Sequence, residues 1–229
     1  MITDVAMDTL VTIEDLRDAN FPVSPEHRTA MESVVTWSRD YLCKSHPALG
    51  RKGPVCPYVA KAMEKNLFFM NVYDGGAPSK AEVAEMMLGY QEQFLAMEPT
   101  QGPDAIFKCI MVMFPNLPKE SAQRIIDESQ SDLIAQFTPN QLMIGEFHPG
   151  PPKKVGLWND KFQPLWCPIP MLVIRQMVNT DILFLRHHRE NTINYLKFYG
   201  DDIPVRMRGH VEEAVARFDI DFELAEAVV

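Results

Sequence analysis

Residues 105–114, AIFKCIMVMF, form the most apolar run in the sequence. A short, continuous apolar run is typical of a strand that is buried on both faces, so we expect a central strand here. A helical pattern behind Ser79 precedes the run, and a second helical pattern follows it over residues 119–136. Further strands are expected on either side of these helices, at residues 67–73 and 141–147. This order predicts a layered α+β or α/β sandwich, in which long helices pack on a mixed sheet whose strand order and directions remain open.

The flanking segments extend this pattern to both ends of the chain. Ser24 and Pro25 mark the start of a helix that should run to about Leu42. Residues 1–22 are expected to be a poorly ordered lead-in, and residues 23–229 a single globular domain. The remaining expected elements are a short helix at 59–65, a strand or helix at 171–177, and closing helices at 181–199 and 206–218.

The composition excludes several classes of partner. The chain has 229 residues, of which 46% are hydrophobic and 23% charged, as in ordinary globular proteins. Its formal net charge of −9 would repel phosphate backbones and anionic membranes. We therefore expect neither nucleic acid nor a membrane as a partner, while the oligomeric state stays open.

The start of the chain and its cysteines indicate the cytoplasm. The first fifteen residues include Asp4, Asp8, Glu14 and Asp15, whereas a secretory signal needs a basic start and an apolar core. The four cysteines, at 43, 56, 109 and 167, form no C-x-x-C pair, so neither a disulfide framework nor a cysteine-rich zinc site is indicated. Reduced thiols in the cytoplasm fit this pattern best.

The segment from Phe147 to Pro170 fits no regular element, because it contains six prolines and two glycines. A connection of this length inside a compact domain is usually functional or disordered. Its aromatic residues Trp158, Phe162 and Trp166 argue against disorder. We expect a long, packed, proline-rich loop over a pocket.

Cys56 lies in Arg51-Lys-Gly-Pro-Val-Cys-Pro57, just before the expected short helix. A thiol that lies at a helix start beside two cations has the setting of a reactive cysteine. The alternative is a structural buried cysteine, which is what most free cysteines are. A Cys-Pro dipeptide also occurs where a thiolate ligates haem iron, so haem is a possible cofactor with Cys56 as its axial ligand.

His148 follows a predicted strand and precedes Pro149-Gly-Pro-Pro152, a place where loops present binding groups. It could act as an acid or base, or it could bond a nearby carbonyl to hold the turn. Glu146 should point to the same side of the strand as His148. Lys153 makes this loop locally cationic, which suits an anionic substrate, although a solvated surface would look the same.

No common catalytic or metal-binding motif is present. The chain contains no H-E-x-x-H, P-loop, G-x-G-x-x-G or G-x-S-x-G sequence, which removes the usual zinc-protease, nucleotide-binding and serine-hydrolase interpretations. His187 and His188 are adjacent and diverge by about 100° on a helix, so they cannot readily share a metal ion. We therefore expect no metal site.

The ordered motifs resemble those of an uncharacterised bacterial family, a domain of unknown function found beside biosynthetic genes. The matching residues are Gly53-Pro-Val-Cys-Pro-Tyr58, Phe147-His-Pro-Gly-Pro-Pro152, Gly156-Leu-Trp-Asn159 and Pro168-Ile-Pro-Met-Leu172, with Arg175. A second uncharacterised family is distantly similar, but it has an aromatic residue at the place of Ile169 and one more residue before the arginine. The resemblance makes Cys56 and His148 the candidate catalytic pair, and Arg175, Trp158 and Asn159 the candidate substrate contacts.

Three hypotheses follow. The first is a small-molecule enzyme of specialised metabolism with a Cys56 thiolate, His148 as its base, and Arg175 holding an anionic or carboxylate group. The second is a haem-thiolate protein. The third is a non-catalytic module that binds a small molecule. The first predicts that the Cys56 sulfur and the His148 ring line one cavity.

Overall fold

A computed structural model describes residues 10–150, 159 and 161–223 of the chain. Four strands form one open sheet: β1 (Phe68–Val72), β2 (Cys109–Met113), β3 (Leu142–Phe147) and β4 (Met171–Gln176). Their order is β1-β2-β4-β3. β1 and β2 are parallel, whereas β4 is antiparallel to both of its neighbours. The predicted mixed sheet of a layered α+β fold is therefore confirmed.

The apolar run at residues 105–114 provides the inner strand β2, as predicted, but the strand is shorter than the run. Ala105–Phe107 forms a 3₁₀ turn, and Lys108 is buried between this turn and the strand. The Lys108 ammonium donates to the carbonyl oxygen of Phe94 at 2.7 Å and to that of Met97, at the end of α4 (Lys80–Ala96). These bonds satisfy orphan helix carbonyls, and they explain how a lysine fits inside an apolar run.

The strand-or-helix ambiguity at residues 171–177 resolves as β4, which lies between β2 and β3. Met171, Leu172 and Ile174 are at most 1% exposed, so both faces of this strand contact core. A strand that is covered on both sides has no polar alternation, and for this reason periodicity could not identify it.

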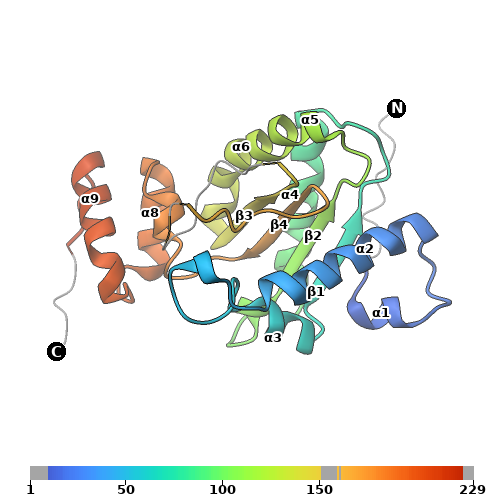
Figure 1. The fold of residues 1–229 in the computed structure, drawn as a ribbon. Helices are drawn as coiled ribbons and strands as arrows, with labels where there is room; N and C mark the ends of the chain where they lie inside the picture. Colours follow the sequence, from blue (N-terminus) through green and yellow to red (C-terminus); the bar gives the residue numbers. More distant parts are fainter. Residues whose placement is uncertain (1–9, 151–158, 160, 224–229) are drawn as a thin grey trace.

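Helices cover both faces of the sheet (Figure 1). On one face lie α4 and α6 (Glu128–Phe137), packed against Ile110 and Val112 of β2. On the other face lie α2 (Pro25–Trp37) and the short α3 (Val59–Glu64), packed over Met111 and Met113. Alternate residues of each strand therefore serve two separate cores. The other helices are α1 (Ile13–Arg17), α5 (Lys119–Ala122), α7 (Ile182–Leu185), α8 (Arg189–Tyr199) and α9 (Arg208–Phe218).

The two long predicted helices begin at their predicted caps. The Ser24 hydroxyl accepts from the His27 N–H at 3.1 Å, and Ser79 forms a capping box with Glu82. After Trp37, the first helix continues as a π-helical turn, Ser38–Leu42. A second π-helical turn, Gln123–Asp127, joins α5 to α6. Such turns are rare and occur often at functional sites.

The N-terminal expectation needs a correction where the structure describes it. From Leu10 onwards the chain is packed rather than poorly ordered: Val11 forms an antiparallel bridge with Met70 of β1, and Ile13 is 6% exposed. Thr12 and Asp15 form a capping box that starts α1. The burial of Val11 and Ile13 and the hydrogen bonds of the capping box together outweigh the loss of conformational entropy when this segment is ordered. No helix within the described residues is long and apolar enough to cross a membrane.

Candidate functional site

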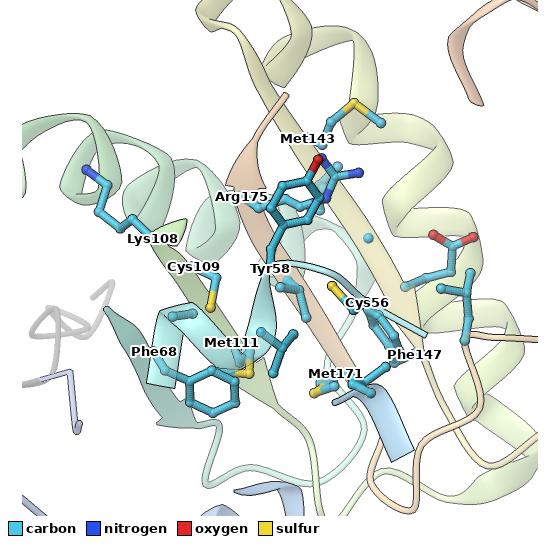
Figure 2. Close-up of a pocket in the computed structure, with 18 of the residues that line it drawn as sticks. Cys56, Tyr58, Phe68, Lys108, Cys109, Met111, Met143, Phe147, Met171 and Arg175 are labelled. Atoms are coloured by element: carbon cyan, nitrogen blue, oxygen red, sulfur yellow. The ribbon is translucent and has the colours of Figure 1, made fainter. Parts of the chain in front are cut away.

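A cavity of about 160 Å³ lies between the sheet and the α2–α3 layer (Figure 2). The strand register forms its floor, because three cross-strand rows point to this face: Cys109, Arg175 and Met143; Met111, Val173 and Gly145; and Met113, Met171 and Phe147. All of these except Met113 line the cavity. Gly145 leaves space in the middle row, since its hydrogen stands where a side chain would project.

The roof of the cavity comes from the end of α2, α3 and the loop between them. Its residues are Trp37, Leu42, Cys56, Tyr58, Val59 and Ala62. The Cys56 N–H donates to the Leu42 carbonyl oxygen at 2.9 Å, and the Val55 N–H donates to that of Lys44 at 2.8 Å. The π-helical turn thus fastens the cysteine loop, and Cys56 keeps intermediate exposure at the cavity wall.

The predicted setting of Cys56 is only partly present. α3 begins at Val59, three residues beyond the thiol, and has six residues. The Arg51 guanidinium donates to the carbonyl oxygens of Lys52 and Val55 at 3.0 Å each, so it braces the loop. Gly53 has φ of 96°, which suits this tight turn because glycine lacks a Cβ. The loop therefore holds Cys56 by backbone geometry.

Arg175 is the cation that stands beside Cys56 and Tyr58 in the cavity (Figure 2). Two of its nitrogens donate to the two carboxylate oxygens of Asp181, at 2.7 Å each, and Nη1 also donates to the Gln176 carbonyl oxygen. Burial lowers the pKa of Arg175, but the Asp181 carboxylate raises this pKa by a larger amount. The net pKa is therefore above the usual value. Asp181 also accepts from the Val178 N–H at 2.7 Å. Arg175 is thus a rigid, largely neutralised cation.

The other thiols and the phenol near the cavity are held in their protonated forms. Burial raises the pKa of Cys109 to about 12, and that of Cys167 likewise to about 12. Burial also raises the pKa of Cys43. The Tyr58 pKa is raised by burial, and the Arg175 charge offsets part of this shift. Tyr58 therefore offers a neutral hydroxyl to the cavity.

His148 is not among the residues that line this cavity, whereas Cys56 is. Its ring, in a residue only 1% exposed, bonds the Asp127 carboxylate through Nε2 at 3.0 Å and accepts from the Gly150 N–H through Nδ1 at 3.1 Å. Asp127 ends the π-helical turn before α6, on the opposite side of the sheet from α2. Phe147 faces the cavity and packs edge-on against Trp37, and strand alternation turns the next residue away. The ring of His148 therefore holds the turn after β3 through these two hydrogen bonds.

The remaining predicted contacts divide into three groups. Glu146 lines the cavity and is 4% exposed. Asn159 does not line it, because its amide donates to the Ala48 carbonyl oxygen at 2.9 Å and its side-chain oxygen accepts from the Lys161 N–H. Trp158 and Lys153 lie outside the described residues. Of the proline-rich segment, Leu165 lines the cavity and Phe162 stacks on His46 at 4.7 Å between ring centroids.

Sequence reasoning missed four residues that shape this region: Asp127, Asp181, Trp37 and Gly145. Asp127 had a visible signal, since it stands between Ile126 and Gln130 on the buried side of a predicted helix. An acidic residue there needs a buried partner. Trp37 lines the cavity, and its buried indole N–H has no acceptor among the described residues. Nothing in the sequence distinguishes Gly145 from an ordinary strand glycine.

No group of three or more histidine, cysteine, aspartate or glutamate side chains in the described part of the chain is arranged to hold a metal ion. A cofactor that requires one protein ligand would find Cys56 as the exposed donor on the roof.

Residues 31–210 match the model of a family described as a domain of unknown function, DUF6875. The chain belongs to this family. The predicted resemblance to an uncharacterised family is thus confirmed, and the match includes every strand and every cavity-lining residue. No curated protein and no solved structure matches the chain.

Proposed function

We propose that this member of the DUF6875 family is a small-molecule enzyme that binds a compact, largely apolar substrate in the cavity and uses the Cys56 thiol as its reacting group. The observation that carries this proposal is the position of Cys56: it is a fastened, partly exposed thiol on the wall of an apolar cavity, beside the Arg175 guanidinium. Reactive cysteines have this partly exposed setting near a cation, whereas structural cysteines are closed off.

The volume of the cavity limits the group that it encloses. A cavity of about 150 Å³ accepts one benzene ring, so the 160 Å³ here fits a ring-sized or short branched group.

Arg175 favours a substrate with an acidic group, although its guanidinium is already paired with the Asp181 carboxylate. Three of the five N–H groups of a guanidinium are used on Asp181 and Gln176. In the described part of the chain the other two have no acceptor, and we assign them to a carboxylate oxygen of the substrate. Binding through them gives directional recognition with little net attraction, since Asp181 cancels most of the charge.

The geometry of His148 changes the expected chemistry. A nucleophilic cysteine is usually paired with a base within hydrogen-bond reach, but His148 is bonded to Asp127 and does not line the cavity. The proposal therefore assigns proton transfer to the substrate or to water that enters the cavity, rather than to this histidine.

Thiol labelling tests the proposal. At pH 7.5, iodoacetamide should modify Cys56 at least about ten-fold faster than Cys43, Cys109 or Cys167, whose raised pKa values suppress the thiolate. Peptide mass spectrometry would measure the four rates in the intact protein. Small aromatic carboxylates that fill the cavity should protect Cys56 from iodoacetamide. Equal rates for all four thiols would contradict the proposal.

One observation favours a haem-thiolate protein as a second candidate. An axial thiolate needs no neighbouring base, and Cys56-Pro57 presents its sulfur to an apolar space without one. The cavity together with the open space at its mouth measures about 970 Å³, so a porphyrin would have to extend into the mouth. Protein expressed with ample haem should then show a Soret band that Cys56→Ser changes. A colourless protein would remove this candidate.

A non-catalytic binding module is the remaining alternative. It predicts that Cys56→Ala retains both ligand affinity and biological output. Loss of output with unchanged affinity and folding would favour the enzyme over the module.

A further inference from the structure

Sulfur-containing side chains border the cavity from both the roof and the floor. Five of its lining residues carry sulfur: Cys56, Cys109, Met111, Met143 and Met171. In Figure 2 the sulfur atoms of Cys56, Cys109, Met111 and Met171 stand around the same part of the cavity, whereas Met143 lies beyond Arg175. We call these first four residues the sulfur cluster.

The sheet register explains why three of the four converge. Cys109 and Met111 are two positions apart on β2, so they point to one face at a separation of about 6.7 Å between Cα atoms. Met111 pairs with Val173, and Met171 is two residues from Val173 on the same face of β4. Diagonal neighbours of this kind lie about 7–8 Å apart, which long methionine side chains bridge easily.

Cys56 completes the cluster from the roof. Cys56 and Cys109 are near enough to interact electrostatically. Both are partly exposed within the cavity, unlike Cys167, which is fully buried. Two thiols from different layers of the fold thus face a space that two thioethers also border.

We propose that the sulfur cluster binds one Cu(I) ion, with the Cys56 and Cys109 thiolates as its principal ligands and the Met111 and Met171 thioethers as weaker ones. Thiolates and thioethers are the soft donors that select Cu(I), while carboxylate and carbonyl oxygens suit harder ions. Zn²⁺ prefers four nitrogen, sulfur or oxygen ligands of the stronger kind, and the described residues offer no such set here.

Binding is a ligand exchange without a redox change. Each thiol loses its proton to solvent as its sulfur forms a bond to copper, so one ion releases two protons and copper remains Cu(I). The bis-thiolate complex carries a net charge of −1, and the Arg175 guanidinium beside Cys56 faces that charge. Copper affinity should therefore rise with pH.

This inference goes beyond the proposed enzyme, with which it shares the cavity and the Cys56 and Arg175 side chains. Cu(I) at the cluster would occupy the reacting thiol, so copper should block iodoacetamide labelling of Cys56. Labelling of metal-free protein tests the enzyme, and copper affinity tests the cluster. The two proposals can therefore fail separately.

The test is an anaerobic titration of the full-length, reduced protein with Cu(I) against a chromophoric Cu(I) chelator. The wild type should take one ion per chain. Cys56→Ser and Cys109→Ser should each lower the affinity at least about 100-fold, and Met111→Leu or Met171→Leu by about ten-fold, because loss of even an outer-shell partner costs 10–100-fold.

Three control variants keep the proposal open to contradiction. Cys43→Ser, Cys167→Ser and Met143→Leu should leave the affinity within about two-fold of the wild type, since none belongs to the cluster. Circular dichroism would confirm that each variant folds. The proposal is overturned if the wild type takes no copper from the chelator, if Cys109→Ser binds as tightly as the wild type, or if Cys43→Ser causes the large loss instead.

Discussion

Phe147 and His148 are neighbours at the end of β3, but their side chains lie in different surroundings. On the α2 side, Phe147 borders an apolar cavity whose wall holds the partly exposed Cys56 thiol. On the α6 side, His148 is closed into a buried pair with Asp127. The face with the more conventional catalytic residue types is thus the closed one. A histidine and an aspartate at 3.0 Å can hold a turn as well as move a proton, and access to a cavity distinguishes the two roles.

The largest contrast should appear in stability. His148→Ala removes the buried partner of Asp127 and should lower the free energy of unfolding by about 3 kcal/mol, because a buried carboxylate is left unpaired. Cys56→Ala should cost less than about 1 kcal/mol, since its side chain borders a cavity rather than filled core. Urea denaturation would measure both. A larger loss from Cys56→Ala would reverse the roles that we assign to the two faces.

The pH dependence of stability should depend on Cys109 and Cys167, two thiols packed on the α2 side of the sheet. The folded-state pKa of Cys109 and of Cys167 is raised by burial to about 12, whereas an unfolded thiol titrates near about 8.5. Below pH 8 both states bind the proton and the stability is fully present. As the pH rises from about 8.5 towards 12, the unfolded chain releases its protons first, so each thiol should cost up to about 1.4 kcal/mol per pH unit.

Denaturation in reductant at pH 8, 9 and 10 would measure this slope. Cys167→Ala should reduce the slope of the unfolding free energy against pH by the contribution of one thiol. Cys56→Ala is the matched comparison, because it removes a thiol from the cavity wall. An unchanged slope in Cys167→Ala would show that this thiol does not hold its proton more tightly in the folded state.

A smaller change should come from Asp127→Asn. The amide can keep one hydrogen bond to the His148 ring, while the charge and its burial cost disappear, so we expect a loss of about 1 kcal/mol or less. The Asp127 Oδ2 atom has no hydrogen-bond partner within residues 10–150, 159 and 161–223, which limits what the ionised form gains over the amide. A loss as large as that of His148→Ala would indicate an ionic pair. Urea denaturation of the two variants side by side would decide.

The smallest effect should come from Gly145→Ala. A Cβ there would meet the Phe147 ring at 3.5 Å, an ordinary contact, and would project into the cavity. The stability should change by less than about 1 kcal/mol, because the strand interior gains a side chain without a clash. Labelling of Cys56 by a bulky aromatic maleimide should slow, while labelling by iodoacetamide should not. If both rates stay unchanged, access to the thiol does not pass over Gly145.

The sequence by itself determined the local elements and the candidate thiol. Ser24 and Ser79 fixed two helix starts, and the apolar run at 105–114 fixed the inner strand, because caps and hydrophobic periodicity act within a few residues. The motif order also indicated an uncharacterised family, and the chain belongs to one. Glu146 and Cys56 were named from their local settings, and both line the cavity.

Only the tertiary structure decided which residues meet. The insertion of β4 between β2 and β3 carries Arg175 beside Cys109, and the loop after α2 brings Cys56 above them. The partner of Arg175 is Asp181, and the partner of His148 is Asp127, 21 residues away in another layer. Strand alternation shows that residues 147 and 148 face opposite sides, but it does not say which side a distant loop will cover. That assignment depends on sheet order and crossovers, which are set by burial summed over the whole chain rather than by any local pattern.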